Sequence, residues 1–348
     1  WLEQPLLDLA GINERLDAVE ELFNSTFLRK ELRDLLKQVY DLERLAGRIS
    51  YGTANARDLA ALKTSLGVLP HLAELIDDVT SSGLQNIKGF LDTLEDITVI
   101  IDGAIADNPP LSVRDGGIIK TGYNNEVDRL RTASAEGKNW IASLEARERE
   151  RTGVKSLKIG FNKVFGYYIE VTRANFSLVP DDYFRKQTLA NVERYITPEL
   201  KECEDSILGA EDRVTQLEYE LFCQVREIVN REVPRIQKCA TLLAALDVYQ
   251  SHAEAALNHN YTRPKVHSGA ALEIKQGRHP VVERVLASEP FIPNDTYLDG
   301  DNHRLDIITG PNMAGKSSYL RQVALICLMA QTGAFVPADE ARIGLVDR

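Results

Sequence analysis

Residues 305–331 constrain the fold more than any other part of the chain, because they fit G-x-x-x-x-G-K-[ST] between a short apolar run and a helical period. The run from Leu305 to Ile308 is apolar and β-branched, which predicts a buried parallel strand. After Ser317, helical spacing is kept by Leu320, Val323, Ala324, Cys327, Leu328 and Gln331. We therefore expect a strand, a loop and a helix in that order.

The loop has the composition of a phosphate-binding cradle. Its backbone N–H groups and the positive end of the following helix favour an anion, and Gly310 and Gly315 permit close approach. Lys316 can reach the β- and γ-phosphates, and the Ser317 hydroxyl can ligate Mg²⁺. We predict ATP or ADP with Mg²⁺ as ligands and Lys316 as the catalytic residue. The predicted nucleotide-binding residues of the loop are Gly310, Pro311, Asn312, Met313, Ala314, Gly315, Lys316, Ser317 and Ser318.

Composition restricts where any nucleic acid can bind. The chain has 348 residues, which suggests two to three domains, and a net charge of -11, which excludes a wholly basic nucleic-acid coat. Residues 153–198 are the exception, with seven Lys and Arg against four Asp and Glu. A modest basic excess is more often a solvated surface, so its place in the fold must decide its role.

The sequence gives little indication of disulfides, metal sites or membrane segments. The four cysteines form no CxxC pair or even spacing, which favours a reduced intracellular protein over a disulfide frame or zinc site. The histidines show no metal-ligand spacing, and we interpret His279 as structural. No apolar run reaches about 18 residues, and no secretory signal precedes the helices. We expect a soluble, cytoplasmic protein with no membrane partner.

Hydrophobic periodicity predicts the domain organisation. Residues 2–110 recur at helical spacing, Pro109 and Pro110 end that bundle, and a helix with a narrow apolar stripe follows from about 125 to 151. Alternation over 157–171 then predicts a β-hairpin. Helix resumes near 198 with a coiled-coil-like seam at intervals of seven, formed by Ile207, Val214, Leu221 and Ile228.

The predicted fold class is therefore multidomain. It comprises an all-α core and lever with long antiparallel helical arms, a small antiparallel β module at their tip, and the amino-terminal part of an α/β P-loop domain. The predicted boundaries are 1–150 for the helical core and ascending arm, 151–197 for the β module, 198–262 for the descending arm, and 263–348 for the P-loop domain.

Several segments, inside and outside the loop, have distinctive sequences in addition to the spacing of the motif. They are GPNMAGKSSYLRQ from Gly310, GAFVPA from Gly333, QGRHPVVE from Gln276, PFIPN from Pro290, and GYYIE with QTLANVERY between 166 and 195. Together they resemble the MutS family of DNA mismatch-repair proteins. Ala314 stands where that family usually has Gly, and Ser318 where Thr is common.

The resemblance implies roles for particular residues. The β module becomes a clamp that touches the backbone of duplex DNA without reading its sequence. Phe291 matches the position whose ring stacks on adenine, and Ile292 that of a backbone contact to the base; the plainer alternative for Phe291 is packing at a sheet edge. Arg194 and Glu193 serve either DNA or the hinge to the next helix. The candidate DNA contacts are Arg173, Asn175, Arg185, Lys186, Thr188, Asn191 and Arg194.

The same resemblance implies an ATP-dependent sensor of mismatches and small loops in double-stranded DNA. Such a protein is a nucleoid-associated homodimer that acts with a downstream MutL-type repair protein. We expect the P-loop domain to be truncated here, since no Asp-Glu segment follows Pro337, so the enzyme activity of this chain alone stays undecided. Two alternatives remain: a DNA-structure-binding recombination protein of the same superfamily, and an unrelated P-loop phosphotransferase.

Overall fold

A computed structural model describes residues 1–162, 164–285, 290–311 and 314–347. They divide into two compact units. The first unit comprises Trp1–Ala46, Thr64–Glu95 and Glu232–Arg348, and the second comprises Gly47–Lys63 and Asp96–Arg231. None of the described helices has an apolar stretch long enough to cross a membrane.

The first unit begins with the amphipathic helix α1 (Leu9–Asn24). The Asp8 carboxylate caps it by accepting the N–H of Gly11 at 2.8 Å. The predicted helical period is confirmed, since the buried residues of α1 include Ile12, Leu16, Val19 and Leu22. The short helices of this unit that follow are α2 (Thr26–Leu36), α5 (Leu69–Leu75) and α6 (Ser82–Phe90). Helix α3 (Leu42–Ser50) spans the boundary between the units, and α4 (Ala56–Leu66) lies mostly in the second unit.

A buried cation joins three of the helices. Arg29 of α2 is almost fully buried and donates to the carbonyls of Leu22 and Phe23, both at 2.9 Å. Its Nε also pairs with Glu254 of α10 (Val233–His259) at 3.1 Å. The carbonyls at the end of α1 carry partial negative charge, which suits a guanidinium.

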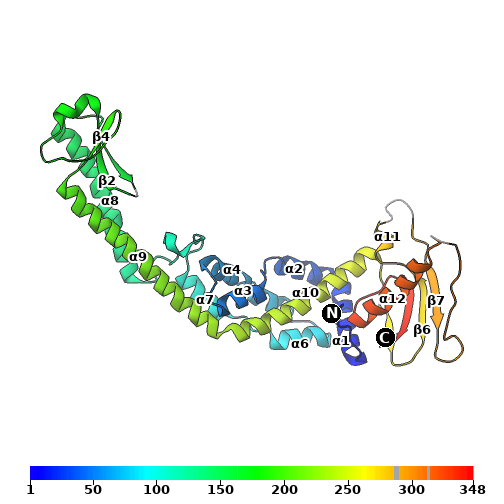
Figure 1. Cartoon of the computed structure of the whole chain (residues 1–348). Coiled ribbons are helices and arrows are strands. Elements are labelled where there is room, and N and C mark those ends of the chain that lie inside the picture. The colour runs from blue at the N-terminus through cyan, green and yellow to red at the C-terminus, as the bar shows by residue number, and fades with distance from the viewer. Residues whose placement is uncertain (163, 286–289, 312–313, 348) are drawn as a thin grey trace. The chain divides into compact units, whose positions relative to one another are not determined.

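The first unit also holds a mixed four-stranded sheet in the order β5-β8-β6-β7. Its strands are β5 (Lys265–His267), β6 (Leu272–Gly277), β7 (Asn294–Leu298) and β8 (Glu340–Gly344). Strands β5 and β8 are parallel, and the other pairs are antiparallel. Helix α11 (Val282–Val285) precedes β7, and α12 (Lys316–Thr332) lies beside the sheet (Figure 1).

The strand predicted at Leu305 to Ile308 is wrong. The segment has no strand conformation, and Leu305 and Ile307 are 79% and 83% exposed. A strand needs a hydrogen-bonded neighbour, and the described edge strands β5 and β7 pair only with β8 and β6, respectively. The apolar run therefore follows the surface as an extended loop.

Helix α12 is confirmed, and the residues whose spacing predicted it are only partly buried. Cys327 and Gln331 are buried, whereas Leu320 is 58% exposed and Ala324 is also exposed. The fully buried stripe is Gln322, Ile326 and Ala330. The stripe is offset because Gln322 packs against Gly277 of β6, while the predicted residues line an open apolar cleft of about 820 Å³.

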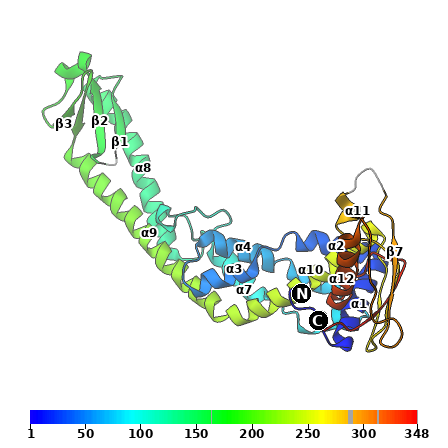
Figure 2. The same cartoon turned by 45° about the vertical axis from the view of Figure 1, so that its right-hand side comes forward.

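The second unit is built around two long helices that run antiparallel and side by side (Figures 1 and 2). They are α8 (Asn125–Thr152) and α9 (Pro198–Arg231), preceded by α7 (Glu95–Ala104) and the 3₁₀ turn η1 (Val113–Asp115). Ion pairs between Arg131 and Glu218 at 2.6 Å and between Arg147 and Glu199 at 2.5 Å fix the antiparallel direction.

The predicted seam of α9 holds for three of its four residues. Ile207, Val214 and Leu221 are buried, but Ile228 is 41% exposed and Val225 and Val229 are buried instead. A straight α-helix drifts about 20° per heptad against a seven-residue repeat, so by the third heptad the repeat has left the interface.

The seam also contains carboxylates that the apolar period did not predict. Glu204, Glu211 and Glu218 are spaced by seven, and the first and last are buried. Glu218 accepts the N–H of Ile118 at 2.9 Å as well as Arg131, and Glu211 pairs with Lys138 at 2.5 Å. Glu211 and Glu218 are therefore each matched to a cation of α8, whereas Glu204 accepts the N–H of Tyr167 in β2 at 2.6 Å.

A small antiparallel sheet stands at the end of these helices, in the order β1-β2-β4-β3 (Figure 2). Its strands are β1 (Lys158–Asn162), β2 (Gly166–Thr172), β3 (Phe184–Thr188) and β4 (Val192–Ile196), with the 3₁₀ helix η2 (Arg173–Leu178) after β2. The predicted hairpin is confirmed, because Ile159 pairs with Ile169 and Phe161 with Tyr167.

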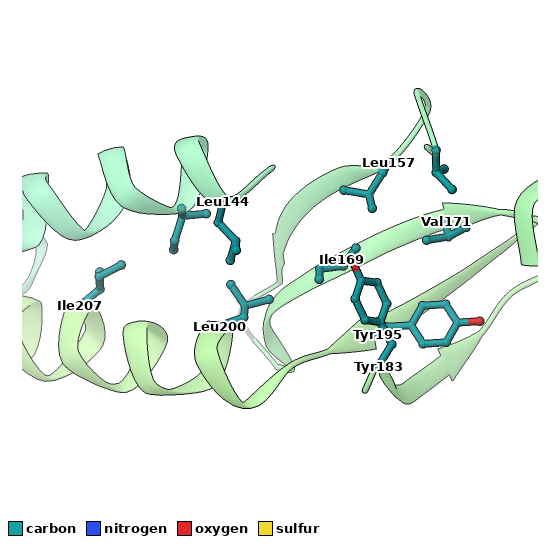
Figure 3. Packing of buried hydrophobic residues seen from close by; sticks show 10 residues of the cluster. Leu144, Leu157, Ile169, Val171, Tyr183, Tyr195, Leu200 and Ile207 are labelled. Atoms are coloured by element: carbon teal, nitrogen blue, oxygen red, sulfur yellow. The ribbon is translucent and has the colours of Figure 1, made fainter. Parts of the chain in front are cut away.

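One hydrophobic core joins the sheet to the helices. In Figure 3 the side chains of α8 and α9 meet those of β2 and β4, and the buried tyrosines close the far side. Glu148 accepts the hydroxyl of Tyr183 at 2.8 Å, and burial together with this carboxylate raises the pKa of Tyr183 above its usual range. The labelled members of this core are Leu144, Leu157, Ile169, Val171, Tyr183, Tyr195, Leu200 and Ile207.

Candidate functional site

The glycine loop and the helix that follows it have the predicted order. Helix α12 begins at Lys316, with Gly315 as its N-cap in a left-handed conformation at φ 85°. Gly310 also has a positive φ, of 149°. Both conformations favour glycine because they strain a side chain. Asn312 and Met313 lie outside the described residues.

The Lys316 side chain folds back over the loop. Its ammonium donates to the carbonyl of Gly310 and, at 2.8 Å, to that of Pro311. The cation is thus held against the loop that precedes α12. An anion bound there would meet a full positive charge and the positive end of the helix together.

An open cleft of about 1010 Å³ lies against the loop. Of the predicted nucleotide residues it brings together Phe291, Ile292, Gly310, Pro311, Ala314, Gly315, Lys316 and Ser318. Phe291 is half-buried and Ile292 is 80% exposed. Ser317 is exposed and does not line the described cleft.

Several described cleft residues were missed by the sequence reasoning, Tyr319 and Asp306 among them. Tyr319 lies three residues after Lys316, on the same face of α12, and its hydroxyl lies 2.9 Å from Thr296 Oγ1 of β7. Asp306 adds a carboxylate to the wall. Helical spacing could have indicated Tyr319, whereas Asp306 lay within the wrongly predicted strand. No group of three or more His, Cys, Asp or Glu in the described ranges could hold a metal ion.

The seven candidate DNA residues fall at three places on the small sheet. One place is the end of the sheet where β2 leaves it: the Arg173 N–H donates to Asn191 O at 3.0 Å, and Asn175 donates to Ser156 and Thr172, both at 3.1 Å. Arg173 and Asn191 are exposed. This end therefore presents a cation beside several hydroxyl and amide groups.

The second place is the edge strand β3. Its pairing with β4 shifts register between Arg185 and Gln187, so Lys186 lies at an irregularity. Lys186 is exposed and forms no ion pair within the described part of the chain. Arg185 is 63% exposed and reaches Glu193 at 3.3 Å, and Thr188 donates to the same carboxylate at 3.3 Å.

Glu193 organises this edge from inside the sheet. It is buried and also accepts the hydroxyl of Tyr195. The hydrogen bond from Tyr195, with further donation by Arg185, lowers the pKa of Glu193, and burial and the carboxylate raise the pKa of Tyr195 to about 12. The carboxylate stays charged and holds β3 against β4.

Arg194, the third place, uses its Nε and Nη1 donors within the sheet. It pairs with Glu170 at 3.1 Å, donates to Gln187 at 3.0 Å, and stacks 4.2 Å above the ring of Tyr168. Only 21% of its side chain is exposed. Arg185, Lys186 and Arg173 therefore offer more accessible positive charge than Arg194.

Comparisons with known proteins agree with this architecture. A family model described as MutS domain III matches residues 1–253, and one described as MutS domain V matches residues 306–348. The DNA mismatch repair proteins MutS of Acetivibrio thermocellus and Desulforamulus reducens are 57% and 59% identical over the whole chain. The chain spans 40% of the length of each of these relatives. It belongs to the MutS family.

Proposed function

We propose that this chain is part of a DNA mismatch-recognition protein. It contacts duplex DNA and supplies the first part of the nucleotide-binding site. The observation that carries the proposal is identity of 57–59% over the whole chain to relatives named DNA mismatch repair protein MutS. The substrate is double-stranded DNA with mismatched bases or small loops. The protein works as a homodimer at the DNA of the cytoplasm and passes the lesion to a MutL-type partner.

The cleft is the proposed site for ATP or ADP with Mg²⁺, and the charge and shape of its lining support this. Lys316 binds the β- and γ-phosphates, and the ring of Phe291 packs against adenine while Ile292 contacts the base through its backbone. The exposed Ser317 hydroxyl suits Mg²⁺, which keeps several waters and needs few protein ligands. The metal supplies charge neutralisation when bound.

The small sheet is the proposed DNA clamp. Arg173, Arg185 and Lys186 are exposed cations on a chain of net charge -11, so they concentrate attraction for phosphates at one place. Contacts to phosphates position a duplex without reading its sequence, which suits a protein that scans for errors. Nucleotide state biases the helical arms between clamp states by binding one state more tightly.

Lys316→Ala in the full-length protein tests the nucleotide site. Removal of two charge-assisted contacts, each contributing about 1.5–3 kcal/mol, should weaken ATP binding by at least about 100-fold in calorimetric titration. Duplex binding without nucleotide should stay at the parental level. Lys275→Ala is the control, because Lys275 forms an exposed ion pair with Glu340 in the same unit. Parental ATP affinity in Lys316→Ala would refute the assignment.

A further inference from the structure

The segment from Gln276 to Pro280 was singled out by its sequence, but the proposed nucleotide and DNA contacts give it no role. It connects β6 to α11, and the structure places it between the cleft and the end of α10. The N–H of Arg278 also donates to the carbonyl of Pro337 at 2.8 Å, which fixes the backbone of the segment.

The Arg278 side chain joins α10 to α11. Its Nε donates to Glu283 of α11 at 2.8 Å, and its Nη2 donates to the carbonyls of His259 and Asn260 at 3.0 Å and 2.9 Å. Both side chains of the ion pair are largely buried, at 19% and 16% exposed. The last carbonyls of α10 carry partial negative charge, so the guanidinium is attracted to both of its partners.

The next residue fixes the start of α11. His279 is buried, and its Nδ1 accepts the N–H groups of Val281 and Val282, each at 3.3 Å. Val282 lines the cleft beside Phe291. Arg278 and His279 thus hold the same short helix, one through a side chain and the other through its free backbone donors.

We propose that Arg278 is a positioning residue, which holds the α11 wall of the nucleotide cleft and ties it to the carboxyl end of α10. The inference rests on the proposed nucleotide site. A nucleotide that fills the cleft contacts Val282, and any shift of α11 carries Glu283 with it. The guanidinium then either follows and pulls on the α10 carbonyls or loses one set of hydrogen bonds. Nucleotide occupancy therefore biases α10 through one side chain.

The geometry requires arginine. A guanidinium is planar and presents donors in a fixed fork, so one group reaches Glu283 with Nε and two carbonyls with Nη2. An ammonium is a compact point charge and cannot keep this arrangement. Arg278→Lys should therefore behave like Arg278→Met in the coupling test, although it retains the charge.

The test uses the full-length protein with ATP as the probe. Two quantities are measured: the ATP dissociation constant, and the ratio of duplex affinities with and without ATP. Arg278→Met should still bind ATP, but the affinity ratio should fall about 2- to 30-fold, the range expected for residues that carry coupling between sites. If Arg278→Met does not fold, Glu283→Gln breaks the same ion pair with a smaller change and should give the same loss.

Arg263→Met is the matched control. Arg263 is 27% exposed, lies in the same unit, and bridges Asp17 and Glu20 of α1 without lining the described cleft. It should lower the melting temperature to a similar extent and keep the parental affinity ratio. If Arg278→Met leaves the ratio of duplex affinities unchanged, or if Arg263→Met lowers that ratio equally, the inference is overturned but the proposed function is not. A parent protein that binds no ATP would overturn the proposed function and the inference with it.

Discussion

The two units bury ionisable groups in different ways. In the second unit, Glu148 and Glu218 are buried and each accepts hydrogen bonds from two donors. In the first unit, His252 packs inside the helices, and its Nε2 has no hydrogen-bond partner in the described ranges. A partnered charge fixes the relative position of the elements that hold it, whereas an unpartnered imidazole is stable only while it is neutral. The paired carboxylates therefore set the register of the helix pair, as Arg29 does for α1, α2 and α10, whereas His252 contributes through packing alone.

Removal of one partner from the polar seam should have the largest effect on stability. Glu218→Ala leaves the N–H of Ile118 without its acceptor in a buried site and takes from Arg131 the carboxylate it pairs with most closely. We expect a loss of about 3–5 kcal/mol in unfolding free energy, the range for breaking a buried ion pair. Urea denaturation followed by circular dichroism measures this loss.

Two variants sharpen that result. Glu220→Ala removes an exposed carboxylate of the same helix and should change stability by less than about 0.5 kcal/mol. The double change Glu218→Leu with Arg131→Met should recover most of the lost stability, because apolar replacements of a buried pair are often neutral or stabilising. Equal losses of unfolding free energy in Glu218→Ala and Glu220→Ala would show that Glu218 is no better shielded from water than an exposed carboxylate.

The seam also shows what periodicity can and cannot predict. Apolar residues at intervals of seven correctly placed three side chains on the buried face of α9. Glu204 and Glu218 share that face, but a count of apolar residues treats every glutamate as solvated. Their burial depends on donors that are distant in sequence, such as Arg131 and the N–H groups of Ile118 and Tyr167. No local pattern contains that information.

The open side of α12 provides the next test. Ile326 is fully buried and Leu320 is 58% exposed, although both are apolar residues of the same helix. Ile326→Ala should cost about 2–5 kcal/mol, the range for truncating a buried isoleucine, and Leu320→Ala less than about 0.5 kcal/mol. Thermal and urea unfolding of the two variants compare them directly. A larger loss in Leu320→Ala would mean that the Leu320 face of α12 packs more tightly than the Ile326 face.

The nucleotide loop was predicted better than its surroundings. The glycine spacing placed the start of α12 at Lys316, because the loop and helix conformations are local properties. The strand predicted at Leu305 to Ile308 was wrong. Strand pairing is non-local, and a short apolar run does not determine which strand would pair with it. Tyr319 and Asp306 were missed for a similar non-local reason. The described cleft combines Val282 and residues around Phe291 with residues on both sides of the glycine loop.

The unpartnered histidine predicts how stability depends on pH. Burial, with the positive charge of Arg15 nearby, lowers the pKa of His252 from 6.5 to about 4. A lowered pKa means that the native state resists protonation, so this stability is present above pH 6.5 and is lost as the pH falls from 6.5 to 4. We expect the loss to reach about 3 kcal/mol, and His252→Leu should remove it. The exposed His71 is the control, since His71→Leu should leave the pH profile unchanged.

The accessible cations of the β3 edge give the smallest effect and the most direct test of the DNA surface. Counterion release makes the logarithm of the binding constant linear in the logarithm of salt, with a slope of about -0.9 per phosphate neutralised. Arg185→Ala with Lys186→Ala should therefore flatten the slope by up to about two units and weaken binding about tenfold near physiological salt. Matched and mismatched duplexes should weaken alike, because phosphate contacts carry no sequence information.

Arg194→Ala separates this prediction from a purely structural effect. Arg194 belongs to the same sheet, but it pairs with Glu170 and donates one hydrogen bond to Gln187. Its removal should lower the melting temperature and leave the salt slope close to the parental value. The double variant should do the reverse, since Lys186 has no ion-pair partner among the described residues and Arg185 is mostly exposed. If fluorescence anisotropy at several salt concentrations shows an unchanged slope for the folded double variant, neither side chain contacts DNA, and the cations of this edge only solvate the sheet.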